Sequence, residues 1–172
     1  QRAHTAPRLR ILLDRAHNAT IMTLFERYDP SLADGIIDAR TPPAQLALLM
    51  NDAITAGEWV GVMADRVTDS DRTLNVTLLG DTLALPAGIW QLACLLDLPV
   101  VSCIGLFDGK QGYDLYFASI SDGMGCARAD RTRVIHDAAQ RFADTLEPHL
   151  HATPYNWFNF YDAWNDDTSS HR

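Results

Sequence analysis

The segment that runs from Gly57 to Ala93 constrains the fold more than any other part of the chain. It begins with the apolar run Trp59-Val60-Gly61-Val62-Met63-Ala64, which ends abruptly at Asp65-Arg66. An apolar run of this length, rich in β-branched and aromatic residues, predicts a strand that is buried on both faces. Open α/β sheets bind ligands outside the carboxyl ends of such strands. Asp65-Arg66 is therefore a candidate ligand site, although a solvated strand end accounts for these two charges equally well.

Strands and helices are expected to alternate on the N-terminal side of this segment. Short apolar runs predict strands at 10–13 and 35–38, and apolar residues at helical spacing predict helices at 18–28 and 42–57. Thr41-Pro42 is a typical helix start, and Gly57 is suited to end the second helix. The order β-α-β-α-β with short connections indicates a parallel sheet covered by helices.

The C-terminal side is expected to continue the same class of fold. The patterns predict the following elements: an alternating, half-exposed strand at 73–79, a helix at 87–96, an apolar strand at 99–106, a strand at 113–118 that forms a hairpin with it, and a long helix at 130–150. The expected fold class is α/β, with a mostly parallel central sheet and helices on both faces. We expect a single domain over 1–164 and a polar, frayed tail at 165–172.

Charge and cysteine usage exclude several classes of protein. The formal net charge of −8 argues against broad nucleic-acid binding, which requires a basic surface. No apolar run reaches about 18 residues, so no membrane-spanning helix is expected. Cys94 and Cys103 lie in apolar elements and are expected to be buried thiols. With Cys126 the count is odd and shows neither disulfide nor zinc spacing, which indicates a reducing compartment.

Few side chains stand out as catalytic candidates. The sequence contains no G-x-S-x-G, no G-x-G-x-x-G and no P-loop. Its 6 histidines, His149 and His151 among them, are expected at the surface. Arg128, Arg131 and Arg133 precede the long helix, and guanidinium groups suit phosphate or carboxylate ligands. A solvated helix start balanced by nearby acids explains these arginines about as well.

The segment from Pro154 to Trp164 is dense in aromatic residues. Aromatic side chains in such numbers must bury against the domain, a lipid surface or a partner. We favour packing onto the domain, with contact at a membrane interface as the second interpretation.

Several short motifs together resemble a known family. The motifs are Gly57-Glu58-Trp59-Val60, Ala64-Asp65-Arg66, Leu79-Gly80, Leu85-Pro86-Ala87-Gly88, Leu92-Ala93 and Leu98-Pro99-Val100-Val101. In this order and spacing they resemble the lipid A biosynthesis (lauroyl/myristoyl) acyltransferases of the lysophospholipid acyltransferase-like superfamily. The C-terminal run from Trp157 to Trp164 is similar to a branch found with aryl-polyene or xanthomonadin-type pigment pathways. The resemblance extends over nearly the whole chain, and it rests on the set of motifs rather than on any one of them.

The resemblance implies an activity and a location. The enzyme would move a fatty acyl group from an acyl-carrier-protein or coenzyme A thioester to a glycolipid- or lysolipid-type acceptor. It would need no metal ion or other cofactor, and nucleic acid is not an expected partner. It would lie on the cytoplasmic side, peripheral on the inner face of a bacterial inner membrane. The acidic net charge is awkward for docking an acidic carrier protein.

The resemblance also implies a set of substrate-binding residues: Asp65, Arg66, Pro86, Gly88, Arg128 and Arg131. The first two occupy the place where the superfamily grips polar groups or phosphate of the acceptor. The next two would shape the loop beside it, where backbone N–H groups at a helix start would face an anion. The last two match an arginine pair that would meet phosphopantetheine phosphate or carrier-protein acids.

One departure from the family pattern is plain. The family carries a His-x4-Asp/Glu motif whose histidine is the general base, and no histidine of this sequence has Asp or Glu five positions later. We therefore expect the C-terminal part of a longer domain, lacking its N-terminal segment, without catalytic residues and inactive by itself. The absence of an initiator Met fits truncation. The alternatives are a non-catalytic acyl- or lipid-binding module and, less favoured, a small-molecule-binding doubly wound domain.

Overall fold

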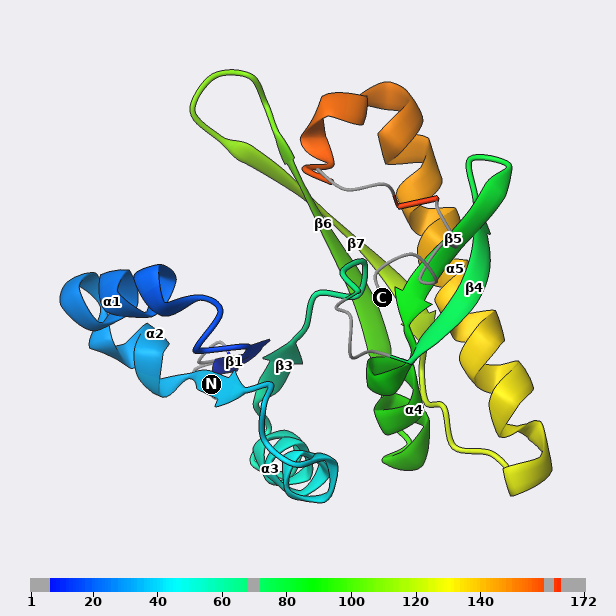
Figure 1. Cartoon of the computed structure of the whole chain (residues 1–172), viewed down its shortest axis with the longest axis horizontal. Helices are drawn as coiled ribbons and strands as arrows, with labels where there is room; N and C mark the ends of the chain where they lie inside the picture. Colours follow the sequence, from blue (N-terminus) through cyan, green and yellow to red (C-terminus); the bar gives the residue numbers. More distant parts are fainter. Residues whose placement is uncertain (1–6, 68–71, 160–162, 165–172) are drawn as a thin grey trace, which may run out of the picture. The chain divides into compact units, whose positions relative to one another are not determined.

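The computed structural model describes residues 7–67, 72–159 and 163–164. The chain divides into two compact units, Gln1–Met63 and Ala64–Arg172. Each unit combines helices with small sheets, which agrees with the expected α/β class (Figure 1). The single domain expected over 1–164 stays a prediction, and the polar tail lies outside the described residues.

The first unit is built on a three-stranded parallel sheet of order β2-β1-β3. Its elements are β1 (Leu9–Leu13), α1 (Ala19–Tyr28), α2 (Pro30–Asp34), β2 (Ile36–Asp38), α3 (Pro43–Thr55) and β3 (Trp59–Gly61). A small core of Met22, Ala33 and Ile36 joins the helices to the sheet. The alternation of strands and helices predicted for this region is confirmed, together with the parallel pairing.

The short helix α2 was not expected, because the sequence patterns predicted only a helix at 18–28 and a strand at 35–38 in this region. Asp29 ends α1 and also caps α2, since its carboxylate accepts a hydrogen bond from the Ser31 N–H at 3.1 Å. Pro30 then occupies the first helical position, where its missing N–H costs nothing. The same dipeptide therefore stops one helix and starts the next.

The strand predicted over 59–64 differs from expectation. β3 ends at Gly61, and Trp59 is 60% exposed, so burial on both faces is wrong. The physical reason is its place in the sheet: β1 holds the middle position, and β3 pairs with it along one side. Gly57 does end α3 as expected, with φ 78° in the left-handed region just beyond Ala56.

The second unit contains two antiparallel hairpins. The first joins β4 (Thr73–Leu78) to β5 (Asp81–Pro86) through Leu79-Gly80, whose φ values of 55° and 84° are those of a type I′ turn. β5 was not predicted from the sequence. A leucine at the first turn position replaces the Asn or Asp that usually signals this turn, and φ > 0 is uncommon for leucine.

The second hairpin joins β6 (Val100–Phe107) to β7 (Tyr113–Ser121), as predicted. Burial alternates along β6, and Cys103 is exposed, so the expectation of a buried thiol at this position is wrong. The four strands of this unit are antiparallel, so the described strands do not join into one mostly parallel central sheet. Among the described strands, parallel pairing is confined to β1, β2 and β3 of the first unit.

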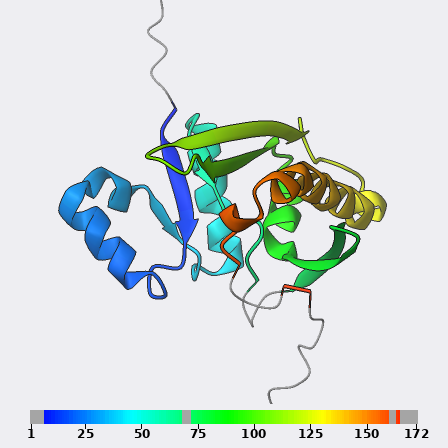
Figure 2. The same ribbon diagram turned by 90° about the horizontal axis from the view of Figure 1, so that it is seen from above.

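Two helices pack against these hairpins, α4 (Ala87–Leu95) and α5 (Arg131–Ala152), and both confirm predictions (Figure 2). The core contains buried side chains from both helices and both hairpins: Val76, Leu78, Leu83, Leu85, Trp90, Ala93, Cys94, Ile120, Met124, Ala138, Ala139, Ala143, Leu146 and Leu150. The alanines of α5 permit close approach of the helix to the strands. Short 3-10 helices, η1 (Arg128–Asp130) and η2 (Pro154–Asn156), flank α5.

Polar side chains of α5 also satisfy backbone groups of the strands. Gln140 accepts from the Thr77 N–H and donates to the Thr77 carbonyl oxygen, both at 2.8 Å. Arg141 donates to the Ile120 carbonyl oxygen at 2.9 Å. These bonds cover strand groups that would otherwise form an unpaired edge, so α5 is fixed against both β4 and β7.

Within the described part of the chain, helices capable of crossing a membrane are absent, because none combines the necessary length with sufficient apolar character.

Candidate functional site

Asp65 lies just after the first unit and is held by the C-terminal segment. The carboxylate is half-buried and its Oδ2 accepts a hydrogen bond from the indole Nε1 of Trp157 at 3.0 Å. Trp157 and Trp164 form an edge-on ring pair with centroids 6.2 Å apart, and both pack against the core. Packing onto the domain is therefore confirmed for these two tryptophans, whereas Tyr155 is 93% exposed.

Arg66 is more exposed than the adjacent Asp65. Its side chain is exposed, and it makes no ion pair within the described part of the chain. A guanidinium group without an internal carboxylate partner retains its five donors for a ligand. The charge of Arg66 is thus not neutralised by an ion pair in the ranges that the structure describes.

Pro86 and Gly88 do not shape a loop, which corrects the sequence-based expectation. β5 ends at Pro86 and α4 begins at the next residue, Ala87, so strand and helix are directly joined. Pro86 is buried, and the Ala87 N–H donates to the Arg72 carbonyl oxygen at 2.7 Å. That N–H is consequently occupied, while Gly88 is exposed in the first turn of the helix.

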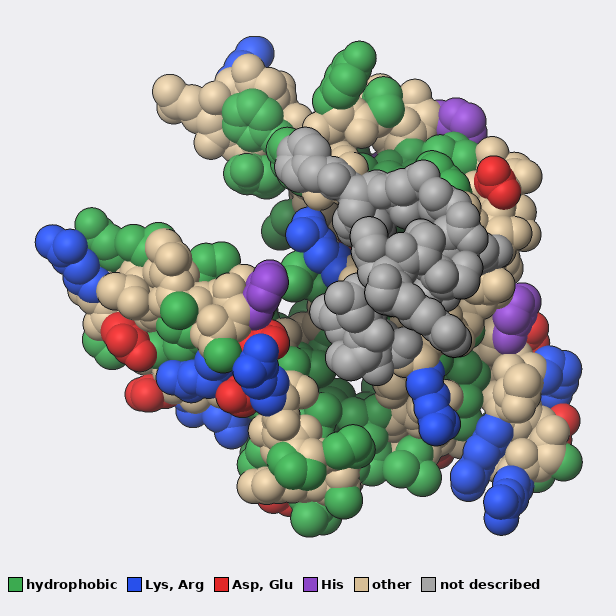
Figure 3. All heavy atoms as spheres, in the orientation of Figure 1, with side chains coloured by type: hydrophobic (Ala, Val, Ile, Leu, Met, Phe, Trp, Pro, Cys, Tyr) green, Lys and Arg blue, Asp and Glu red, His purple; other side chains and the backbone are tan. Residues whose placement is uncertain are grey.

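The arginines before α5 divide into two kinds. Arg133 pairs with Asp130 at 3.3 Å and Asp137 at 3.5 Å, as a solvated helix start would. Arg128 and Arg131 are exposed and lack an ion pair among the residues that the structure describes. Figure 3 shows Lys and Arg side chains gathered over this end of α5. Because the start of a helix carries positive partial charge, these two arginines add to a positive field.

The loop that precedes Arg128 is tied to the end of α4. Asp97 accepts a hydrogen bond from the Gly125 N–H, and any side chain at position 125 would collide with the Asp97 carboxylate. The Sγ atoms of Cys94 and Cys126 lie 3.7 Å apart, a proximity that sequence spacing did not suggest. Burial, followed by the contact with Cys126, raises the pKa of the Cys94 thiol.

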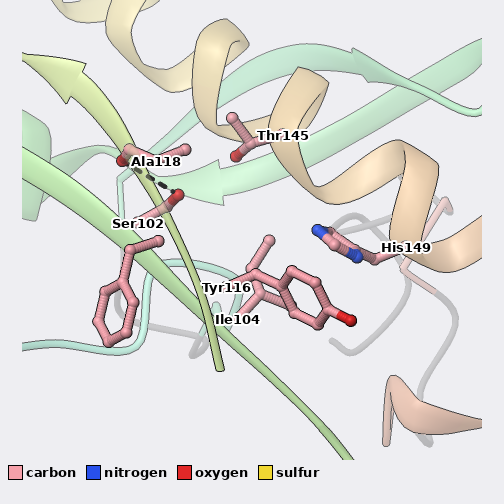
Figure 4. Close-up of a pocket in the computed structure, with 7 residues that line it drawn as sticks. Ser102, Ile104, Tyr116, Ala118, Thr145 and His149 are labelled. Atoms are coloured by element: carbon pink, nitrogen blue, oxygen red, sulfur yellow. Dashed lines mark hydrogen bonds between the residues drawn. The ribbon is translucent and has the colours of Figure 1, made fainter. Parts of the chain in front are cut away.

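A pocket of about 240 Å³ lies between α5 and the β6–β7 hairpin, which we call the hairpin pocket (Figure 4). Its lining residues are Ser102, Ile104, Tyr116, Phe117, Ala118, Thr145 and His149. The rings of Tyr116 and His149 face each other with centroids 4.6 Å apart and planes tilted by 47°. His149 is half-buried, so it is less exposed than the surface position expected for the histidines.

A signal for His149 was present in the sequence. It follows Phe142 and Leu146 at helical spacing of seven and three positions, so it falls beside the apolar stripe of α5. The hairpin pocket itself could not be predicted, because it needs the register of β6 against β7.

The six proposed substrate-binding residues occupy three places: the segment after β3, the β5–α4 junction and the start of α5. The β5–α4 junction and the start of α5 lie toward opposite ends of α4. The junction is at the N-terminal end of α4, whereas the charge of Arg131 acts on Cys94, near the C-terminal end of α4. In the ranges described, no group of three or more His, Cys, Asp or Glu side chains could hold a metal ion.

These features can be compared with known families. The fold is of the α/β class, and Arg66, Arg128 and Arg131 are exposed. The sequence profile of the bacterial lipid A biosynthesis acyltransferases matches residues 37–166. The match covers most of the chain, and the chain therefore belongs to this acyltransferase family. A comparison with curated proteins found no match.

Proposed function

We propose that this chain forms the substrate-binding part of an acyltransferase that uses an acyl-carrier-protein or coenzyme A thioester and a lipid-type acceptor. The observation that carries the proposal is the family match over 37–166, which includes all six candidate residues. Three of them, Arg66, Arg128 and Arg131, are exposed cations without an internal ion pair among the described residues. Phosphate and carboxylate groups of such substrates suit these guanidinium groups.

The roles follow from position. Arg66, beside the oriented carboxylate of Asp65, would bind polar groups or phosphate of the acceptor. Arg128 and Arg131 would bind the phosphate of phosphopantetheine or acids of the carrier protein. Gly88 would allow close approach at the start of α4, with Pro86 fixing the strand end behind it. We further propose that the two units belong to a lysophospholipid acyltransferase-like fold of the pigment-pathway branch.

The reaction needs a base to remove the proton from the acceptor hydroxyl or amine. The acceptor atom then attacks the thioester carbonyl carbon, the C–S bond breaks and the carrier leaves as a thiol after taking up a proton. A positioned base contributes roughly 10²–10⁴-fold. Because no histidine here precedes Asp or Glu by five positions, we propose that the 172-residue chain binds substrates without turnover.

The test compares this chain with the longest product that its gene encodes in frame. Acyl transfer is measured from an acyl-carrier-protein thioester to a lysolipid, and the proposal expects transfer by a product that includes a His-x4-Asp/Glu motif. In that product Arg66→Ala should lower the rate at least tenfold. Arg27→Ala, which removes another exposed arginine on α1, is the matched control and should leave the rate unchanged. Equal rates for both variants would remove Arg66 from the site.

The second candidate is a non-catalytic acyl- or lipid-binding module. The observation that favours it is the absence of the base motif from this sequence, combined with the hairpin pocket. The binding-module candidate expects acyl binding without turnover in every product of the gene.

We also propose peripheral attachment to the inner face of the inner membrane, for which co-sedimentation with anionic phospholipid vesicles is the direct measurement.

A further inference from the structure

We propose that the hairpin pocket binds the acyl chain of its ligand, with the oxygen-bearing end of that ligand held by His149 and Tyr116. The choice of an acyl chain rests on the function proposed above. The assignment of the pocket rests on its shape and on where its hydrogen-bonding groups lie.

The pocket exists because small side chains face each other across its floor. Ser102 pairs directly with Ala118 in the β6–β7 register, and both project toward α5. Thr145 lies opposite them on the helix. Protein interiors are otherwise closely packed, so three small residues at facing positions leave room that larger side chains would fill.

The walls of the pocket are formed by Ile104 on β6, Tyr116 on β7 and His149 on α5. Ile104 pairs with Tyr116, two residues from Ser102 and Ala118 on the same face of the hairpin. His149 follows Thr145 by four residues and so lies above it on the same face of α5. The pocket therefore has small side chains at one end and the rings of Tyr116 and His149 at the other.

The hydroxyl groups of the floor are already engaged within the protein. Ser102, which is 5% exposed and the one buried polar side chain among the described residues, donates to the Ala118 carbonyl oxygen at 3.4 Å. Thr145 donates to the Phe142 carbonyl oxygen at 2.7 Å. No O–H donor of the floor remains to be satisfied, so this end suits methylene groups rather than a polar ligand.

The ring end has the opposite character. Across the described ranges, neither the imidazole of His149 nor the hydroxyl of Tyr116 makes a hydrogen bond, and the hydroxyl points away from Ser102 (Figure 4). His149 lies in the last turn of α5, and its ring nitrogens supply the second polar group at this end of the pocket. Two available donors at one end and an apolar floor at the other fit a chain with a carbonyl or carboxylate head.

The experiment uses octanoate, octanol and octylammonium as probes, titrated calorimetrically into the 172-residue chain. Octanoate should bind most tightly, and octylammonium, which cannot accept a hydrogen bond, most weakly. Ala118→Ile fills the floor with a residue suited to strands and should weaken octanoate binding at least tenfold. Ser119→Ile adds the same side chain at the neighbouring exposed position of β7 and should change the affinity less than twofold.

Circular-dichroism melting checks that each variant is folded, and Ser102→Val replaces Ala118→Ile if the latter does not fold. His149→Leu should weaken octanoate binding and leave octanol binding within twofold. A folded floor variant that binds octanoate as the unaltered chain does, or equal binding of all three probes, would overturn the pocket assignment.

The transfer assay separates this proposal from the proposed function. Loss of octanoate binding in Ala118→Ile with unchanged transfer by the longer product would show that the pocket does not hold the reacting chain, and the acyl-transfer function would stand. Probe binding as described, with no transfer by any product of the gene, would support the pocket and overturn the enzyme.

Discussion

The indole N–H of Trp157 donates to the Asp65 carboxylate at 3.0 Å, across 92 positions of sequence. This bond joins the start of the second unit to the segment that follows α5, and it holds one carboxylate oxygen of a proposed acceptor-binding residue. The C-terminal aromatic segment, which packs on the core through Trp157 and Trp164, thus contributes to the orientation of Asp65.

Trp157→Phe should destabilise the protein by about 1–2 kcal/mol, because a hydrogen bond to a charged group is lost while an aromatic ring is retained. Urea unfolding measures the change. Combined with Asp65→Asn in a double-mutant cycle, the two substitutions should be non-additive, since they remove parts of one interaction. Additive effects would show that the two side chains act independently.

An added thiol oxidant such as diamide should link Cys94 to Cys126. Their sulfur atoms are 3.7 Å apart and need approach to about 2.05 Å for a disulfide. Both thiols lose a proton and diamide takes up the two electrons and two protons, so the intact mass should fall by two hydrogen atoms. Cys126→Ser should abolish the change and Cys103→Ser should not, because Cys103 lies exposed on β6. Retention of both free thiols under excess diamide would contradict the proximity.

Gly88→Ala should raise the free energy of unfolding by about 0.5–1 kcal/mol. Gly88 is helical in α4, and a Cβ atom there would meet nothing within 4 Å, so only the entropic cost of glycine is removed. Gly125→Ala is the contrasting change and should destabilise, because its Cβ would displace the Asp97 carboxylate, which then loses its hydrogen bond from the residue 125 N–H. If Gly88 also allows close approach of substrate, Gly88→Ala should lower transfer despite its higher stability.

Asp108→Ala should destabilise the protein more at neutral pH than in acid. Hydrogen bonds from the backbone N–H groups of Gly112 and Lys110 lower the pKa of the Asp108 carboxyl in the β6–β7 turn. A lowered folded-state pKa contributes stability that is present above the ordinary pKa and is lost as pH falls through the folded pKa. Unfolding curves of both proteins should therefore converge at low pH. Asp108→Asn keeps an acceptor without charge and should lie between them, with little pH dependence of its own.

Local patterns in the sequence determined a large part of this structure. The periodicity of apolar residues located α3, α4 and α5, Gly57 marked the end of α3, and the patterns at 99–106 and 113–118 predicted the hairpin of β6 and β7. The same short motifs pointed to the acyltransferase family that the profile match then showed. These features depend on residues a few positions apart, whose torsional preferences and hydrogen bonds act within one helix turn or one hairpin.

Only the tertiary structure decided which faces of those elements are buried and which side chains distant in sequence come into contact. The apolar run at Trp59 is as hydrophobic as a central strand, yet β3 lies beside β1 rather than between two neighbours. Cys94 and Cys126, Asp65 and Trp157, and Tyr116 and His149 meet through packing of segments distant in sequence. Burial and side-chain proximity are properties of several elements packed together, so local sequence constrains them weakly, whereas it strongly constrains the elements themselves.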